Sequence, residues 1–208
     1  METPPKKLLP LTLFAIAVTS LFSVQSAQAF TMTLEQVGLN VVATGSGAFN
    51  LMGLTSQGIG MGGVALVQAN TGLIQIGAAN HPNLDIYRGF TGPTSFGVGA
   101  QFLANIGSGD FVGLRQGIAL GGGVAGLLFV PTGYVSGTAL LDSMTFNNAT
   151  FASLGVTPGT YVWSWGDGAN QRFTLIIGRA GVPDGGSTVS LLGFALFGLV
   201  ALRRKLSC

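Results

Sequence analysis

Between the two terminal segments of the sequence, few side chains could do acid–base chemistry, and the carboxylates are the first candidates. Two acids about 5 to 9 Å apart can act as acid and base, or as acid and nucleophile, in glycoside hydrolysis. Asp110 with Asp142 or Asp167 is the pair that such a hydrolase would use. These acids stand far apart in the sequence, so only the folded chain sets their separation. We expect that the chain is not an enzyme and assign it no catalytic residue.

One histidine and one cysteine limit the metal and thiol chemistry of the chain. His81 stands in an Asn80-His81-Pro82-Asn83 segment, and Cys208 is the last residue of the sequence. A zinc site or a catalytic triad would have to be built around a single imidazole. No segment has the spaced D-x-D-x-D-G pattern of a calcium loop. We therefore predict no metal site and no intrachain disulfide.

Two glycine-rich segments, residues 58–63 and 121–126, match the dinucleotide-binding pattern G-x-G-x-x-G. Glycine is frequent here, with 34 among 208 residues, so roughly one such match is expected by chance. The pattern carries meaning only between a strand and a helix, and no helix is predicted after Gly63. Asp85 lies near the distance of a ribose-binding acid, but this alone does not make a site. We predict that the chain binds no dinucleotide and no other cofactor.

Three aromatic rings alternate along one predicted strand, at Tyr161, Trp163 and Trp165. Side chains two residues apart in a strand share one face, so the three rings lie together. Large rings of this kind usually fill a core. If they were exposed, they would form a stacking platform for sugars, which makes a carbohydrate-binding module the alternative function. An exposed fraction below one tenth for the two tryptophans would exclude that use.

Short apolar runs punctuated by glycine, asparagine and proline predict a β-rich body for residues 30–181. The glycines show no period of three, which excludes a collagen-like chain, and no stretch of the body has a long helical stripe with caps. The fold class is therefore predicted as mainly β, an antiparallel β-sandwich or jelly-roll-like body. The predicted strands are residues 31–36, 39–44, 48–51, 63–68, 73–77, 85–89, 111–114, 125–130, 143–146, 159–165 and 172–177.

Most of the basic charge lies at the two ends of the chain. The formal net charge of +2 includes Lys6 and Lys7 near the start and Arg203, Arg204 and Lys205 near the end. Between these ends the charges nearly cancel and form no basic patch, so we predict no nucleic-acid partner. The charged residues of the body are Arg88, Arg115, Arg172 and Arg179 against Glu35, Asp85, Asp110, Asp142 and Asp167.

The first 29 residues have the pattern of a secretory signal peptide. Lys6 and Lys7 precede an apolar stretch at residues 8–22, and a small-residue region ends in Ala27-Gln28-Ala29. Cleavage by signal peptidase after Ala29 would make Phe30 the first mature residue. The alternative is an uncleaved anchor, but Pro10 interrupts the apolar stretch, which is shorter than the ~20 residues of a spanning helix. We predict a signal-peptide helix, and hence an exported protein.

The last 27 residues have three consecutive features of a membrane-directed signal. Val182-Pro183-Asp184-Gly185-Gly186 comes first, residues 189–202 form an apolar run, and Arg203-Arg204-Lys205 follows. As a helix the run would span ~21 Å, short of the ~30 Å hydrocarbon layer. We predict a transient anchor in the inner membrane with the basic residues in the cytoplasm. The alternatives are a plain single-pass anchor or a buried terminal helix.

This carboxy-terminal segment resembles the PEP-CTERM sorting domain, in a variant that has Val-Pro-Asp in place of Pro-Glu-Pro. The resemblance rests on Val182-Pro183-Asp184-Gly185-Gly186-Ser187-Thr188, on the glycine-containing apolar run and on the basic stop. It implies a substrate of exosortase, a separate cysteine transpeptidase of Gram-negative bacteria that make exopolysaccharide. The tail would be recognised in the inner membrane and cut near the Pro-Asp-Gly segment. The body would then be delivered to the cell surface or the extracellular matrix.

The body resembles one that recurs in the same group of proteins, through residues 33–38, 40–47 and 151–161. That group carries no molecular activity that could be transferred to this chain. We therefore expect three parts, a signal peptide at 1–29, a β-sandwich body at 30–181 and a sorting signal at 182–208. The expected function is structural or adhesive, in an exopolysaccharide layer. A carbohydrate-binding module is the alternative, followed by a secreted hydrolase.

Overall fold

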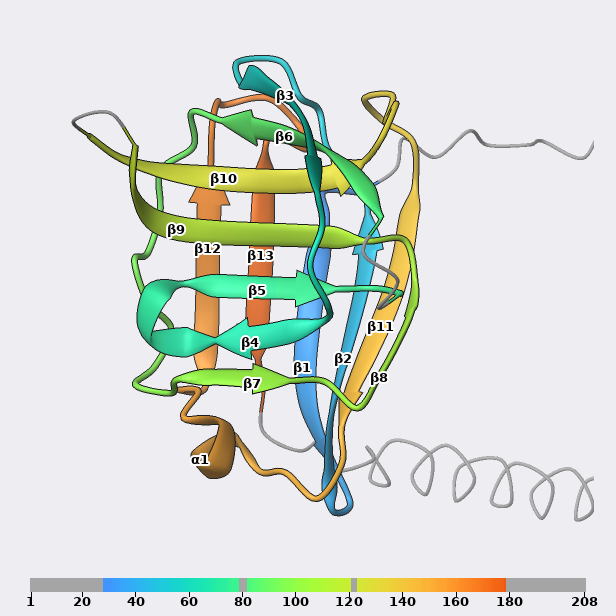
Figure 1. Ribbon diagram of the computed structural model, residues 1–208, viewed down its shortest axis with the longest axis vertical. Coiled ribbons are helices and arrows are strands. Elements are labelled where there is room, and N and C mark those ends of the chain that lie inside the picture. The colour runs from blue at the N-terminus through green and yellow to red at the C-terminus, as the bar shows by residue number, and fades with distance from the viewer. Residues whose placement is uncertain (1–27, 79–81, 121–122, 179–208) are drawn as a thin grey trace, which may run out of the picture.

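A computed structural model of the chain describes residues 28–78, 82–120 and 123–178. The described residues form two β-sheets packed face to face, and the strands of one sheet run across those of the other (Figure 1). Crossed packing of this kind places the core between the sheets. The prediction of a mainly β body is confirmed for these residues. The predicted helices of the signal peptide and the tail lie outside the described residues.

The first sheet contains six strands, which are β1 (Thr31–Val37), β2 (Asn40–Gly47), β8 (Ile106–Gly109), β11 (Leu140–Phe146), β12 (Gly159–Ser164) and β13 (Arg172–Ile177). Their spatial order is β12-β13-β1-β2-β11-β8. β1 and β13 pair in parallel, whereas the other neighbours pair antiparallel. A two-residue turn joins β1 to β2 and begins at Gly38, whose φ of 60° suits a type II′ hairpin.

The second sheet contains seven strands, which are β3 (Thr55–Met61), β4 (Leu66–Gln68), β5 (Leu73–Ile76), β6 (Asn83–Arg88), β7 (Gln101–Leu103), β9 (Val112–Leu120) and β10 (Gly123–Pro131). Their spatial order is β3-β6-β10-β9-β5-β4-β7, and all the pairs are antiparallel. β9 and β10 form the long hairpin at the centre of this sheet (Figure 1). Between β4 and β5 lies a short 3-10 helix, Ala69–Thr71.

The core lies between the sheets and is rich in aromatic rings. Strict alternation along β13 buries Phe173, Leu175 and Ile177 and leaves the intervening side chains outside. The ring centroid of Phe30 lies 4.8 Å from that of Phe49 and 5.2 Å from that of Phe173. Tilted ring pairs at such distances contribute about 0.5–1.5 kcal/mol each beyond the burial of their area. β13 therefore closes the core at the end of the described chain.

One short helix, α1 (Phe151–Leu154), connects β11 to β12. Thr150 caps its start, because the Thr150 hydroxyl accepts from the Ser153 N–H at 3.1 Å and the Ser153 hydroxyl accepts from the Thr150 N–H at 2.8 Å. Gly155 ends the helix with a φ of 62°, a conformation that glycine adopts without strain. The sequence analysis did not predict this helix, which is a single turn without a helical stripe.

The predicted strand at residues 48–51 is wrong. Ala48 makes only an isolated bridge to Ala29, and the next backbone donors bond to side chains or, at Asn50, to the carbonyl of the loop residue Asn170 instead of a neighbouring strand. The Phe49 N–H donates to the Tyr134 hydroxyl at 2.9 Å, and the Leu51 N–H donates to the Ser136 hydroxyl at 3.0 Å. β3, β7 and β8 were not predicted, because their exposed positions and glycines lack the alternation of a half-buried strand.

Candidate functional site

The predicted signal-peptide cleavage site falls where the described chain begins. Ala27 lies outside the described residues, whereas Ala29 and Phe30 lie within them. Phe30 is fully buried, and its backbone N–H donates to the carbonyl of Ala48 at 3.2 Å. A mature chain that begins at Phe30 would therefore keep its first side chain in the core. Its terminal ammonium could keep the hydrogen bond to Ala48 as a charge-assisted one.

The described chain ends beside β1, at the end of β13. The Gly178 N–H donates to the carbonyl of Leu34 at 3.1 Å, which prolongs the parallel pairing of the two strands. The body therefore ends within a few residues of the predicted sorting signal. All the predicted residues of that signal lie outside the described residues, namely Val182, Pro183, Asp184, Gly185, Gly186, Arg203, Arg204 and Lys205. Within the described residues, no helix has the length and hydropathy needed to cross a membrane.

The aromatic rings of β12 and its continuation belong to the core. Trp163 is fully buried and Trp165 is 9% exposed, both below the one-tenth limit set for a sugar-stacking platform. The Trp163 Nε1–H donates to the carbonyl of Pro93 at 2.8 Å, and the Trp165 Nε1–H donates to that of Asn50 at 2.7 Å. Tyr161 is half-buried and meets Phe96 edge to face. The expectation that these rings fill the core is confirmed, and burial of the two tryptophans excludes the alternative of a sugar-stacking platform.

Two of the three candidate carboxylates come together at the edge of the first sheet. β11 places Asp142 opposite Gly109 of β8, so Asp110 follows directly beside it. The Asp110 carboxylate accepts from the Leu141 N–H at 2.9 Å. Asp142 points inward and is 4% exposed, with its carboxyl group against Gly45, where a side chain would collide with it. The sequence pattern could not reveal this pairing, because it depends on the alignment of two distant strands.

The Asp142 carboxyl group lies in a poor environment for a charge. Neither of its oxygens has a hydrogen-bond partner among the described residues. Burial raises the pKa of Asp142 to about 8, and the negative charge of Asp110 adds to the increase. Asp142 is therefore protonated at neutral pH. Because its oxygens are sealed in the core, this pair can hold a proton but cannot reach a sugar linkage.

Asp167 lies apart from this pair, in the loop that connects β12 to β13. Neither Asp167 nor Gly168 has a positive φ angle. The left-handed residue of the loop is Asn170, with a φ of 64°. The buried Gln171 side chain closes the loop by accepting from the Gly168 N–H at 2.7 Å and donating to the Met52 carbonyl at 2.6 Å. Asp167 is therefore a loop residue and does not join Asp110 and Asp142.

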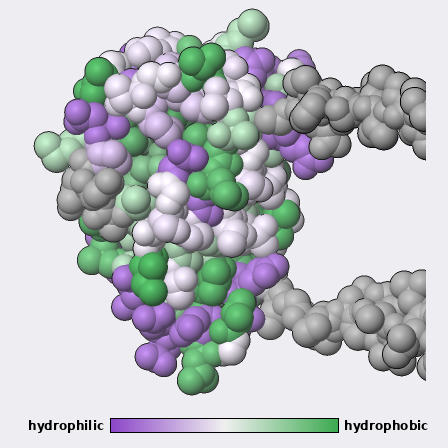
Figure 2. All heavy atoms as spheres, turned by 90° about the vertical axis from the view of Figure 1, so that its right-hand side faces the viewer, coloured by the Kyte–Doolittle hydropathy of each residue, from purple (hydrophilic) through white to green (hydrophobic). Residues whose placement is uncertain are grey.

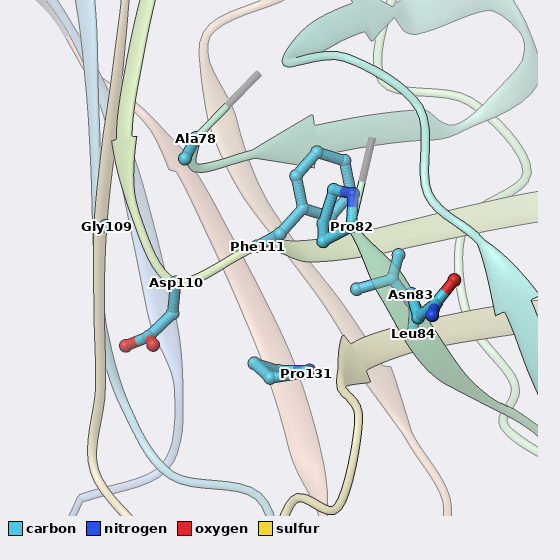
Figure 3. Close-up of a pocket in the computed structure, with 8 residues that line it drawn as sticks. All are labelled: Ala78, Pro82, Asn83, Leu84, Gly109, Asp110, Phe111 and Pro131. Carbon is cyan, nitrogen blue, oxygen red and sulfur yellow. The ribbon is translucent and has the colours of Figure 1, made fainter. Parts of the chain in front are cut away.

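A small pocket of about 210 Å³ lies beside Asp110 (Figure 3). It is smaller than the 300–1,000 Å³ of typical small-molecule sites. Figure 3 shows the Asp110 carboxylate pointing away from the Phe111 and Pro82 rings, so this carboxylate contributes little negative potential to the pocket. His81, the sole histidine, lies outside the described residues. The lining residues are Ala78, Pro82, Asn83, Leu84, Gly109, Asp110, Phe111 and Pro131.

The remaining sequence candidates do not form a cofactor or metal site in the described part of the chain. Residues 58–63 belong to the edge strand β3 and the segment after it, and no helix follows them before β4. Residues 121 and 122 of the second glycine match lie outside the described residues, and residues 123–126 belong to β10. No group of three or more His, Cys, Asp or Glu side chains converges among the residues searched.

The outer face of the first sheet has rows of hydroxyl side chains that the sequence analysis missed. Register across the six strands forms one row of Thr160, Ile176, Thr33, Thr44, Ser143 and Ser108. A second row contains Val162, Thr174, Thr31, Ser46 and Leu141. Neighbouring strands lie about 4.8 Å apart, so the side chains within each row are regularly spaced. Hydroxyls at alternate positions, as at 31 and 33 or at 44 and 46, were the available sequence signal.

These rows leave hydrogen-bonding groups free on a nearly uncharged surface. The Ser108 and Ser143 hydroxyls bond to each other at 2.8 Å. The hydroxyls of Thr33 and Thr44 have no protein partner among the described residues. Glu35 and Arg172 are the charged side chains on this face, and they stand near opposite ends of it. The face can therefore offer donors and acceptors to an uncharged partner.

The comparisons with known proteins identify one part of the chain. Residues 181–206 match the VPDSG-CTERM motif, a variant of the PEP-CTERM-like exosortase sorting signals. No curated protein and no solved structure matches the chain. The resemblance inferred from the carboxy-terminal sequence is thus confirmed for this segment.

Proposed function

We propose that this chain is an exosortase substrate whose body serves as a structural or adhesive element of an exopolysaccharide layer. The observation that carries the proposal is the sorting motif at residues 181–206. Such a signal implies export and placement at the cell surface or outside the cell. The proposed partners are signal peptidase, an exosortase and, transiently, the inner membrane of a Gram-negative cell.

The position of the motif relative to the fold supports processing of a folded protein. β13 supplies Phe173, Leu175 and Ile177 to the core, and the described body ends at Gly178. A cut within or after Val182-Pro183-Asp184 would therefore remove no core residue. The same reasoning holds at the other end, where cleavage before Phe30 keeps that ring in the core. Processing at both ends leaves the β-rich body intact.

The surface of the body supports adhesion more than catalysis. The hydroxyl rows around Thr33 and Thr44 suit hydrogen bonding to a neutral glycan, because the charged side chains of that face, Glu35 and Arg172, stand near its opposite ends. The candidate carboxylates suit catalysis poorly, since Asp142 is sealed in the core and Asp167 stands apart. We therefore propose a body that is not an enzyme and needs no cofactor.

Matrix retention in an exosortase-bearing, polysaccharide-producing host tests this proposal. One variant combines Thr33→Lys and Thr44→Lys on the hydroxyl face, and Thr55→Lys on the exposed edge strand β3 is the control. We expect the double variant to be exported but to shift from the matrix into the medium, whereas the control stays in the matrix. A chain without residues 182–208 should fail to reach its normal location. Equal matrix retention of both lysine variants would contradict adhesion through this face.

A further inference from the structure

One end of the body, which we call the exit pole, gathers exposed apolar side chains where the chain leaves the fold. Its segments are the hairpin tip at 36–40, residue 98, residues 102–106 where β7 continues into β8, and the segment 147–155 that contains α1. Hydrogen bonds connect these segments. The Gln36 Nε2–H donates to the Ala149 carbonyl at 2.9 Å, and the Asn147 N–H donates to the Asn105 Oδ1 at 2.7 Å. Figure 1 places them together at the lower end of the molecule.

The residues that define the exit pole include several exposed apolar side chains and no charged one, and the exposed Glu35 of β1 lies next to them. Leu39 is 78% exposed and Val37 is 54% exposed, and they flank Gly38 at the hairpin tip. Val98, Leu103 and Ile106 are also exposed. None of the residues that define the pole is Asp, Glu, Lys or Arg. Figure 2 shows hydrophobic side chains interspersed with polar ones at the lower end of one face.

The topology directs the departing chain toward this pole. β13 runs parallel to β1, and Gly178 is hydrogen-bonded to Leu34, three residues before Val37. The chain after Gly178 therefore leaves in the direction in which β1 runs to the hairpin tip. From Gly178 to Val189, where the apolar run begins, a fully extended chain reaches at most about 40 Å. An apolar run held in a membrane would keep the exit pole close to the lipid surface.

We propose that the exit pole rests on the lipid bilayer while the sorting signal is attached, with Val37 and Leu39 entering the interfacial region. The inference depends on the proposed function in one respect, that the apolar run at 189–202 is membrane-inserted. An uncharged pole has no ion to desolvate when it meets lipid. Two apolar side chains bind a membrane weakly alone, but a short tether supplies a high effective concentration. Cleavage of the tail removes the tether, so the body can then leave the membrane.

Fluorescence quenching by spin-labelled lipid tests this contact in the full chain. Cys208→Ser removes the native thiol, and Leu39→Cys then carries an environment-sensitive label at the exit pole. Val135→Cys in the same background is the matched control, because Val135 is 69% exposed and precedes β11, at the opposite end of that strand from Asn147. Both proteins are reconstituted in neutral phosphatidylcholine vesicles, and vesicle flotation is measured in the same samples.

We expect the Leu39 label to be quenched several-fold more strongly than the Val135 label. In a chain carrying Val37→Asn and Leu39→Asn, quenching of a label at Val98→Cys should fall although the protein still floats. If the protein floats with the vesicles but the Leu39 and Val135 labels are quenched equally or not at all, the exit-pole contact is overturned and the proposed sorting is left intact. Failure to float would overturn membrane insertion of the tail and the contact with it. Two further results would overturn the assignment of lipid as the partner. The first is quenching of the Leu39 label only in membranes that contain exosortase. The second is shielding of that label by a second copy of the chain, without quenching by lipid.

Discussion

Replacing Asp142 by asparagine should remove a pH dependence of stability that is built into the core. Asparagine keeps the shape of the side chain but cannot ionise. In the native protein Asp142 is 4% exposed, its oxygens lack hydrogen-bond partners among the described residues, and its pKa is raised to about 8. In the unfolded chain the pKa of an aspartate is about 3.9. The native state therefore holds one more proton than the unfolded state between these two values.

The sign and size of the effect follow from this difference. Below about pH 4 both states are protonated, and Asp142 does not destabilise the fold through ionisation. Between about pH 4 and 8 the free energy of unfolding should fall by about 1.4 kcal/mol for each pH unit. Above about pH 8 the native carboxyl also ionises and the curve flattens. The total loss is about 5 kcal/mol, a large part of the 5–15 kcal/mol of a typical domain.

Urea unfolding of the exported body from pH 4 to pH 9 measures this effect. We expect the difference in unfolding free energy between Asp142→Asn and the native chain to grow by about 5 kcal/mol over this range, with the variant gaining. Asp110→Asn is the control, because removing the neighbouring charge should lower the pKa of Asp142 and move the flattening to lower pH. Parallel curves for the native and Asp142→Asn proteins would refute a protonated, unpartnered carboxyl group.

Three further substitutions test other parts of the fold by urea denaturation at constant pH. Trp163→Ala should cost about 3–5 kcal/mol, since it removes a fully buried ring and its bond to Pro93; a loss below about 1 kcal/mol would contradict its core position. Gly45→Ala should cost about 1–3 kcal/mol, because the new methyl group would collide with the Asp142 carboxyl, and Asp142→Gly in the same chain should recover part of the loss; additive losses would contradict this contact. Thr150→Ala should cost about 1 kcal/mol by removing the cap of α1, whereas an unchanged midpoint would show that the cap contributes nothing.

Features encoded by neighbouring residues could be predicted from the sequence. β13 was predicted with its observed bounds, because Phe173, Leu175 and Ile177 alternate strictly with outward side chains. The sorting signal was predicted because motif, apolar run and basic stop follow one another without interruption. The aromatic face of β12 was also predicted from alternation, and burial of Trp163 decided between its two interpretations.

Features that depend on strand pairing could not be predicted in this way. β11 covers residues 140–146, but the sequence predicted a strand only from residue 143. Asp142 is accommodated because β2 places Gly45 opposite it, and the sequence does not state that register. The same limit applies to the hydroxyl rows, since Thr33 and Ser108 come from strands far apart in the chain. The exit pole likewise depends on the parallel pairing of β1 with β13.

The mass of the carboxy-terminal peptide of the surface product tests the central claim most directly. The full chain is expressed in a host with its exosortase and in the same host lacking that enzyme, and surface material is digested and analysed by mass spectrometry. The account predicts that the surface product ends within residues 182–188 only when the exosortase is present. A surface product that still contains Arg203, Arg204 and Lys205 in the exosortase-bearing host would contradict it.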